Sequence, residues 1–360
     1  MNGILKKLIR PHYHAMAGYV SAGMESGKDE SRVFLNANES PYELPGLEGL
    51  NRYPVPQPPE LLAAYGKAYG VAPEHILATR GADESIKLLT RVFCEPHKDA
   101  ILIHPPTFGI YKVDAHSLPV NVAEIPLIEK DGTFALDADK IIAAAQSGNV
   151  KIIYICSPNN PTGTAFAQAD ILRICKQIED KCIVVVDEAY VEFSQGGSLA
   201  AKLGSHPNLM ILRTMSKAYS MAGARMGVTL CADADFIRFM NEKVAEIYPL
   251  PKPSITAAIK ALGMTEEVKK NVTKILAARD ELKKALAQSP LVTHIYPSDA
   301  NFLLVQMKNA KAFCAFAAEN GMMLRDFSSK PGTENCLRIT AGTPEQNEAL
   351  LKLLKRFEAQ

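Results

Sequence analysis

The chain has 360 residues, of which 47% are apolar and 22% are charged, and its formal net charge is +1. This composition is that of a globular protein with a large core, and the length favours two lobes. The balanced charge gives no support for nucleic acid or an anionic membrane as a partner.

The seven cysteines are scattered, their number is odd, and none form a C-x-x-C pair. We therefore expect reduced thiols in a cytoplasmic protein. The N-terminal residues lack the apolar stretch of a signal peptide, and no apolar run is long enough to span a membrane. His12 and His14 are spaced like a metal pair, but no cysteine or carboxylate cluster accompanies them, so we expect no metal.

The first 60 residues are irregular and rich in proline, with a strand-like stretch at 33–39. A helix is then predicted over residues 60–70, where Gly70 ends it, and residues 76–93 read as strand, turn and helix. Further strands are predicted at 100–106, 150–160, 182–190 and 208–219, with a helix at 170–180. Short apolar strands separated by helices predict an α/β domain with a mostly parallel sheet and helices on both faces.

The proline-rich segment 248–254 indicates a boundary. Beyond it the patterns predict a long helix, two strands and a final helix, at 266–286, 301–307, 335–342 and 344–357. This order is typical of a smaller α+β lobe. We accordingly divide the chain into an N-terminal arm (1–45) that packs with the small domain or a neighbouring subunit, a large domain (46–250) and a small C-terminal domain (251–360).

Ligands of open α/β sheets bind at the carboxyl ends of the strands. In this chain five successive predicted strands end in polar or glycine-containing turns, which a purely structural sheet does not need. These turns are Gly81–Glu84, Pro106–Phe108, Asn159–Pro161, Asp187–Tyr190 and Thr214–Lys217.

Lys217 follows one of these strands, so its amine is expected in the crevice, where a lowered pKa makes a lysine a nucleophile and a base. By composition alone it would be a solvated surface lysine. However, Thr214, Ser216 and Arg225 lie nearby in the sequence, and two hydroxyls with a guanidinium suit a phosphate.

Asp187 follows a strand that reads as buried, and a buried carboxylate needs a cationic partner. A protonated pyridine nitrogen is such a partner, and Tyr190 and Asn160 can donate to an oxygen on the same ring. Asp187 can also be read as a helix N-cap or a member of a structural ion pair.

The turn Gly81–Asp83 opens a helix, whose free N–H groups favour an anion. Asp83 can equally be the N-cap of that helix. Phe108 can stack on an aromatic ring or pack in the core, and these two interpretations stay open.

Several segments resemble the signature segments of the fold-type I aminotransferases that depend on pyridoxal 5′-phosphate (PLP). These segments are SPNNPTG (157–163), VVVDEAY (184–190) and TMSKAYSMAGARMG (214–227). Within that superfamily the chain is similar to the histidinol-phosphate aminotransferases of histidine biosynthesis, through residues 36–42, 50–54, 80–84, 105–111 and 336–343. The resemblance extends from about Leu35 to the C-terminus.

The resemblance implies that Lys217 binds the cofactor covalently, Asp187 pairs with its ring nitrogen, and Phe108, where many relatives have Tyr, stacks on its ring. It implies that Asn160 and Tyr190 bond the ring oxygen, and that the cofactor phosphate is held by Ala82, Asp83, Thr214, Ser216, Arg225 and, from the opposite subunit of a homodimer, Tyr53. For the substrates, the resemblance implies that Arg338 binds the carboxylate of glutamate and that Arg325 and Tyr19 bind a phosphate ester. It also implies that Asn160 contacts the substrate.

The implied reaction transfers the amino group of L-histidinol phosphate to 2-oxoglutarate, giving imidazole acetol phosphate and L-glutamate. An aromatic amino-acid aminotransferase or a threonine-phosphate decarboxylase would use nearly the same residues. A non-catalytic PLP-binding regulatory module is a further alternative, but no helix-turn-helix region or basic arm precedes the sheet.

Overall fold

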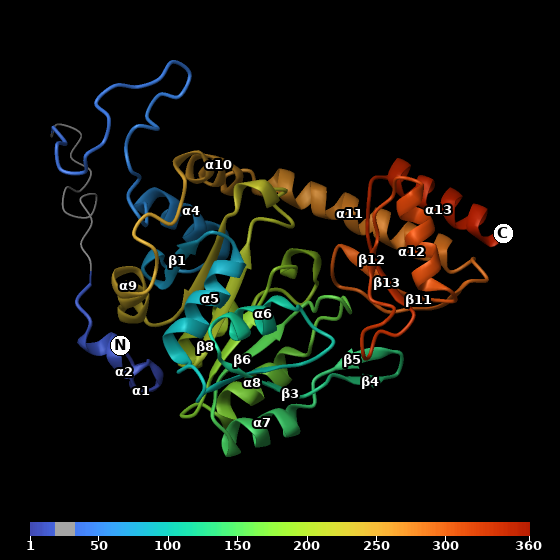
Figure 1. Ribbon diagram of the computed structural model, residues 1–360, viewed down its shortest axis with the longest axis horizontal. Coiled ribbons are helices and arrows are strands. Elements are labelled where there is room, and N and C mark those ends of the chain that lie inside the picture. Colours follow the sequence, from blue (N-terminus) through green and yellow to red (C-terminus); the bar gives the residue numbers. More distant parts are fainter. Residues whose placement is uncertain (19–32) are drawn as a thin grey trace.

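The computed structural model describes residues 1–18 and 33–360. Its large lobe is built on a sheet in the order β1-β9-β8-β7-β6-β2-β3 (Figure 1). Only β9 runs antiparallel to its neighbours, β1 and β8, and the other pairs are parallel, which confirms the predicted sheet. The strands are β1 (Ile76–Thr79), β2 (Ala100–Ile103), β3 (Asn121–Glu124), β6 (Val150–Cys156), β7 (Ile183–Asp187), β8 (Leu209–Thr214) and β9 (Gly227–Cys231).

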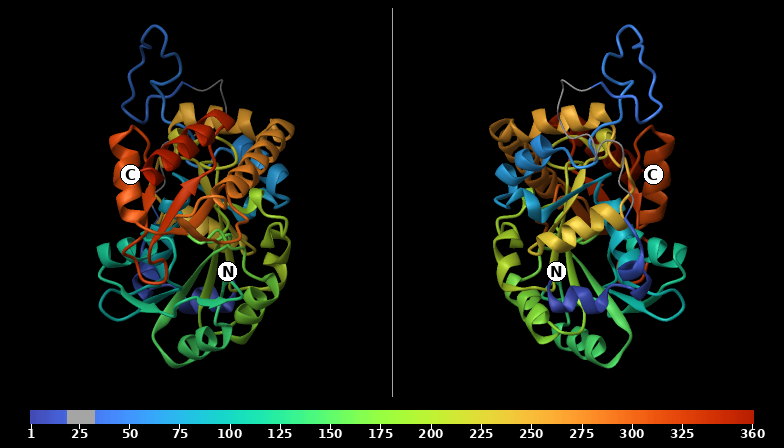
Figure 2. Two further views of the ribbon diagram at one scale, coloured as in Figure 1. Left: turned by 90° about the vertical axis from the view of Figure 1, so that its right-hand side faces the viewer. Right: turned by 90° about the vertical axis from the view of Figure 1, so that its left-hand side faces the viewer.

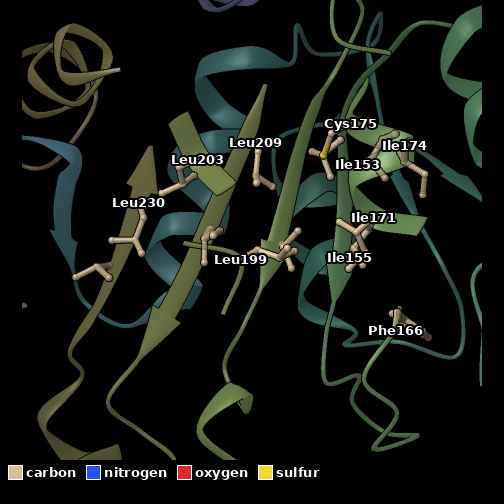
Figure 3. Close-up of a cluster of buried hydrophobic side chains, with 14 of the residues drawn as sticks. Ile153, Ile155, Phe166, Ile171, Ile174, Cys175, Leu199, Leu203, Leu209 and Leu230 are labelled. Atoms are coloured by element: carbon tan, nitrogen blue, oxygen red, sulfur yellow. The ribbon is translucent and has the colours of Figure 1, made fainter. Parts of the chain in front are cut away.

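Both faces of this sheet are buried, because successive side chains of a strand point to opposite faces. In β6, Ile153 and Ile155 belong to one apolar cluster, whereas Ile152 and Tyr154 belong to another. Figure 3 shows part of the first cluster. The helices over that cluster are α4 (Pro59–Tyr69), α7 (Ala138–Ser147), α8 (Gln168–Gln177) and α10 (Lys252–Leu262). The helices over the second are α5 (Ala82–Phe93), α6 (Ile110–Ser117) and α9 (Ala234–Lys243).

The smaller lobe contains an antiparallel sheet in the order β10-β11-β13-β12. Its strands are β10 (Val292–Ile295), β11 (Phe302–Met307), β12 (Arg325–Asp326) and β13 (Cys336–Thr340). Its helices are α11 (Thr265–Leu286), α12 (Ala310–Glu319) and α13 (Pro344–Glu358). Figure 1 shows α11 running from the large lobe to the smaller one, whose α+β character agrees with the prediction.

The two lobes touch beside a hairpin of β4 (Ile128–Lys130) and β5 (Thr133–Ala135). The ring of His294 lies 3.1 Å from the carbonyl oxygen of Gly132. The backbone N–H of Asp299 donates to the carbonyl of Gly163 over 2.7 Å. These contacts hold the small-lobe sheet beside the carboxyl ends of the parallel strands.

Two features differ from the sequence-based division. Helices α1 (Gly3–Leu8) and α2 (Pro11–Ala15) pack on the large lobe, because Leu5 and Tyr13 complete the apolar cluster of α5 and α9. Helix α10 follows the predicted boundary at 250/251, yet Ile255 and Ala258 pack in the same cluster as α4. Helix α10 therefore packs with the large lobe, although the sequence-based boundary assigns it to the small domain.

Residues 33–39, which read as strand-like, form no strand. Val33 and Leu35 are 84% and 88% exposed, and no strand in the described part of the chain pairs with this stretch. Figure 2 shows the segment before α4 projecting away from the body of the molecule in both views.

The short 3-10 helices are η1 (Pro73–His75), η2 (Val191–Phe193), η3 (Leu199–Ser205) and η4 (Ala222–Ala224). No helix within the described ranges has both the length and the apolar character needed to cross a membrane.

Candidate active site

A cavity of about 240 Å³ lies at the carboxyl ends of the parallel strands. Because β6, β7 and β8 are adjacent and parallel, their last residues, Cys156, Asp187 and Thr214, come together there. The lining residues are Ala82, Asp83, Phe108, Cys156, Asn160, Asp187, Ala189, Tyr190, Thr214, Ser216, Lys217, Ala222, Arg225 and Arg338. The structure thus brings together all the predicted site residues that it describes, except Tyr53 and Arg325.

One end of the cavity has the features of an anion site. Helix α5 begins there after Gly81, whose φ is 77°, and its first N–H groups have no partners within the helix. The Arg225 guanidinium donates to Asp83 over 2.9 Å and to the hydroxyl of Ser216 over 3.4 Å. The Thr214 hydroxyl donates to that of Ser216 over 3.0 Å. A phosphate fits this set of donors.

The close approach of two chain segments shapes this end. A β-carbon on Gly227 would lie 2.6 Å from the carbonyl carbon of Gly81, so only glycine fits there. Arg225 itself has a φ of 55°, in the left-handed region that side chains other than glycine rarely adopt. The backbone is therefore bent to bring this guanidinium to the N-terminus of α5.

Lys217 lines the cavity with its amine 5.5 Å from the centre of the Tyr190 ring. Burial, and secondarily the charge of Arg338, lowers the pKa of Lys217. A lysine with a lowered pKa has more of its amine in the neutral form, which is both a nucleophile and a base. Lys217 thus has the properties needed to bond an aldehyde and to move a proton.

Asp187 is 2% exposed at the end of β7, and burial raises its pKa to about 6. Its Oδ2 accepts a hydrogen bond of 2.8 Å from the Tyr111 hydroxyl, and its Oδ1 accepts one of 3.1 Å from the N–H of Ala189. Within the described part of the chain it forms no ion pair. A buried carboxylate that lines a cavity and forms no ion pair fits a cofactor that brings a protonated ring nitrogen.

Arg338 extends from β13 of the smaller lobe into the cavity. Its Nη1 donates to Oδ1 of Asn160, and its guanidinium lies 5.4 Å from the Phe302 ring and 5.8 Å from the Phe327 ring. Its Nε is buried and has no hydrogen-bond partner among residues 1–18 and 33–360. A guanidinium with an unsatisfied donor next to a cavity suits a carboxylate.

Two predicted residues do not line the cavity, and a third falls outside the described residues. Arg325 is exposed and pairs in register with Arg338 across β12 and β13, so the two cations are neighbours. Tyr53 is 55% exposed and stacks on Tyr248 of its own chain, with ring centres 4.3 Å apart. Tyr19 lies outside the described residues.

The sequence reasoning missed Tyr111 and Cys156. Tyr111 lies inside the motif 105–111, three positions after Phe108, but its helical spacing there resembles that of any core aromatic residue. Cys156 pairs in register with Asp187. Because Cys156 ends the predicted strand next to the one that Asp187 ends, the sequence could have placed Cys156 beside Asp187. No three His, Cys, Asp or Glu side chains converge on a possible metal position among residues 1–18 and 33–360.

Comparisons with known proteins agree with this geometry. The model of the family "Aminotransferase class I and II" matches residues 32–354. The histidinol-phosphate aminotransferase 2 of Idiomarina loihiensis is 40% identical over 98% of this chain and 99% of its own length. The histidinol-phosphate aminotransferase of Xanthomonas axonopodis pv. citri is also 40% identical, over 98% and 97%.

The fold has solved counterparts. The crystal structure of histidinol-phosphate aminotransferase from Sinorhizobium meliloti, in complex with PLP, has a TM-score of 0.76 and 23% identity, and the match covers 85% of this chain and 84% of that one. The chain belongs to the class I and II aminotransferases. It is a PLP-dependent enzyme of fold type I.

Proposed function

We propose that this enzyme transfers the amino group of L-histidinol phosphate to 2-oxoglutarate, giving imidazole acetol phosphate and L-glutamate. The proposal is supported by the names of relatives that are 40% identical over nearly the whole chain. The observation that carries it is the half-buried Arg338 guanidinium, whose Nε has no hydrogen-bond partner among the described residues. Beside it, the exposed Arg325 supplies a second cation.

Two neighbouring guanidiniums suit a site that must accept two different anions. Arg338 is the proposed partner for the α-carboxylate of glutamate or 2-oxoglutarate. Arg325 is the proposed partner for the phosphate ester of histidinol phosphate, with Tyr19 beside it. A planar guanidinium can bind either anion through two parallel hydrogen bonds.

The proposed roles of the other side chains follow from their positions. Bound PLP supplies an electron sink for the negative charge that develops on the substrate Cα. The Nζ of Lys217, in its neutral form, takes the proton from that Cα and would deliver it to the imine carbon of the cofactor, and a positioned base contributes about 10²–10⁴-fold. Asp187 pairs with the ring nitrogen, while Asn160 and Tyr190 donate to the ring oxygen and Phe108 packs on the ring face.

The donors at the start of α5 have a separate proposed role, which is to hold the cofactor phosphate. They are the backbone of Ala82 and Asp83 and the side chains of Thr214, Ser216 and Arg225. Because Arg225 is already paired with Asp83, the cradle is ordered before the phosphate arrives. Such a preformed site loses less entropy on binding.

The test is rapid mixing of the PLP-loaded enzyme with L-histidinol phosphate while the cofactor absorbance is followed. We expect conversion to the pyridoxamine form, with a higher kcat/KM than for phenylalanine or threonine phosphate. If histidinol phosphate is the poorest of the three, the substrate assignment is wrong. Release of CO₂ from threonine phosphate would instead favour a decarboxylase.

Arg325→Gln tests the phosphate assignment within the same enzyme. Loss of a hydrogen bond to a charged group corresponds to a fall in kcat/KM of roughly 10- to 100-fold for histidinol phosphate. The half-reaction with glutamate, which has no phosphate, is the internal control and is expected to change much less. Equal losses in both half-reactions would contradict a phosphate-specific role for Arg325.

We also propose that the enzyme works in the cytoplasm as a homodimer whose active sites are shared. The support is the projecting segment before α4, where Val33, Leu35 and Tyr42 are more than 80% exposed, and the position of Tyr53 outside its own cavity. We take these exposed apolar side chains as part of the surface that meets the second chain. A Tyr53 hydroxyl that reaches the partner's cofactor phosphate would complete the site.

Mixing two inactive variants tests the exchange of Tyr53. In a mixed dimer of Lys217→Ala and Tyr53→Ala chains, one site keeps both an intact Lys217 and an intact Tyr53. We therefore expect activity to return after the two variants are unfolded and refolded together. A failure to recover activity, although mixed dimers form, would show that Tyr53 serves its own chain.

A further inference from the structure

Tyr111 lies next to the cavity without lining it, and it is fully buried. It lies three positions after Phe108, and its hydroxyl donates to Oδ2 of Asp187 over 2.8 Å. Its ring meets that of Phe108 edge-on, with centres 5.6 Å apart and an angle of 89° between the ring planes. One side chain thus contacts two residues to which we assign direct cofactor contacts.

We infer that Tyr111 is a positioning residue, which orients the Asp187 carboxylate and stabilises it in its ionised form so that the proton of the pair stays on the cofactor's ring nitrogen. This inference rests on the proposed role of Asp187. Tyr111 itself acts through Asp187 and touches neither substrate nor cofactor.

The Asp187 carboxylate is held at both oxygens. Oδ2 accepts from Tyr111, and Oδ1 accepts from the backbone N–H of Ala189 over 3.1 Å. Two donors on different oxygens fix the plane of the carboxylate as well as its position. The lone pairs that remain are available to a group in the cavity, which Asp187 lines.

The Tyr111 hydroxyl is a permanent donor. Burial, followed by the charge of Asp187, raises the pKa of Tyr111 well above its usual value, so this hydroxyl keeps its proton at neutral pH. A phenol that always donates to the carboxylate stabilises the carboxylate form, because a hydrogen bond to an ionised group is stronger than one to its neutral form.

The surrounding rings hold Tyr111 in place. It stacks on Tyr154 of β6, with ring centres 4.9 Å apart and planes 5° from parallel. The Tyr154 hydroxyl donates to the carbonyl of Ile86 over 3.0 Å and lies 2.9 Å from the Thr90 hydroxyl. The two stacked tyrosines are therefore a matched pair, in which only Tyr111 donates to Asp187.

The Tyr111 hydrogen bond affects the proton that Asp187 would share with the ring nitrogen of the cofactor. A proton between a carboxylate and a pyridine nitrogen rests either on nitrogen, as an ion pair, or on oxygen, as a neutral pair. The Tyr111 hydrogen bond favours the ion pair, because it stabilises the charged carboxylate. Without it, the proton shifts toward Asp187 and the ring loses part of its positive charge.

The test compares Tyr111→Phe with Tyr154→Phe, both loaded with PLP that carries ¹⁵N in its ring. Each substitution removes one buried hydroxyl and keeps the stacked rings, so both variants are expected to fold. For Tyr111→Phe we expect the ¹⁵N signal of the bound cofactor to move from the protonated toward the unprotonated position, and the PLP dissociation constant to rise on the order of tenfold. For Tyr154→Phe we expect only a lower unfolding temperature.

A third variant, Asp187→Asn, tests the proposed role of Asp187 by the same ¹⁵N measurement. It therefore shows whether a negative result concerns Tyr111 or Asp187. If Asp187→Asn moves the ¹⁵N signal and Tyr111→Phe does not, Tyr111 is only a packing residue and the inference is wrong. If Asp187→Asn leaves the signal unchanged, the proposed role of Asp187 fails instead, and the inference fails with it. In the double variant, Tyr111→Phe is expected to add little to Asp187→Asn, because Tyr111 acts through that carboxylate.

Discussion

Arg338 donates a hydrogen bond from Nη1 to Oδ1 of Asn160 and so joins β13 of the smaller lobe to the segment that follows β6 in the large lobe. The bond orients the Asn160 amide, because its oxygen is taken and its nitrogen is left to donate. It also holds the guanidinium at the cavity before any substrate is bound. A single pair of side chains thus links the proposed carboxylate site to the proposed cofactor site.

Replacing Arg338 by Gln removes the charge and the paired donors. We expect kcat/KM for 2-oxoglutarate to fall on the order of 100-fold, which is the loss of a hydrogen-bonded charge at a partly buried site. The absorbance of the bound cofactor should persist, since Lys217 and Asp187 are untouched.

The matched control for this substitution is Arg356→Gln, which changes an exposed arginine on α13 that bonds Asn320. It should leave the kinetics with 2-oxoglutarate unchanged. Wild-type kcat/KM for 2-oxoglutarate in Arg338→Gln would mean that another group binds the carboxylate.

The buried Asp187 makes the stability of the cofactor-free protein depend on pH. Burial raises its pKa from 3.8 to about 6, so between these values the folded protein keeps a proton that the unfolded chain releases. The free energy of unfolding contributed by Asp187 therefore falls as the pH rises from about 4 to about 6, by about 3 kcal/mol, and is constant above that range.

The measurement is urea unfolding of the cofactor-free wild type and of cofactor-free Asp187→Asn at several pH values. Asn cannot ionise, so the variant should lack this part of the pH dependence, and its stability relative to the wild type should increase from pH 4 to pH 6. A difference in stability that is the same at every pH would contradict the raised pKa of Asp187.

Much of this architecture could be predicted from local patterns. The buried strands read as short apolar runs, and the polar residues after them had to meet, because the ends of neighbouring parallel strands share one edge of the sheet. This reasoning placed Asp187, Lys217 and Asn160 in one site. The long helix predicted at 266–286 matches α11 to within one residue.

Other features depend on packing between distant segments. Nothing in the sequence near Ile255 indicates that α10 packs on α4 rather than on the lobe that follows it. Asn160 and Arg338 are 178 residues apart, so their hydrogen bond follows from how the lobes dock. We expect Tyr53 to act at the active site of a second chain, so its role does not follow from contacts within its own chain. Tyr111 was missed because a buried aromatic residue on a helix usually belongs to the core.

The close contact between Gly227 and the turn at Gly81 gives the last prediction. In Gly227→Ala the new β-carbon would lie 2.6 Å from the Gly81 carbonyl carbon and 2.7 Å from the Ala82 nitrogen, so the turn or the start of β9 must move. We expect a loss of about 1–3 kcal/mol in stability, as for other overpacked sites.

The same displacement should weaken PLP binding, because the turn at Gly81 carries the N-terminal N–H groups of α5 toward the proposed phosphate site. Gly223→Ala is the matched control in the same loop, since its β-carbon would meet no atom within 4 Å and its φ is not positive. It should change stability by no more than about 0.5 kcal/mol. Thermal unfolding and titration of the cofactor-free protein with PLP measure both effects, and PLP affinity equal to that of the wild type in Gly227→Ala would show that this turn does not hold the phosphate.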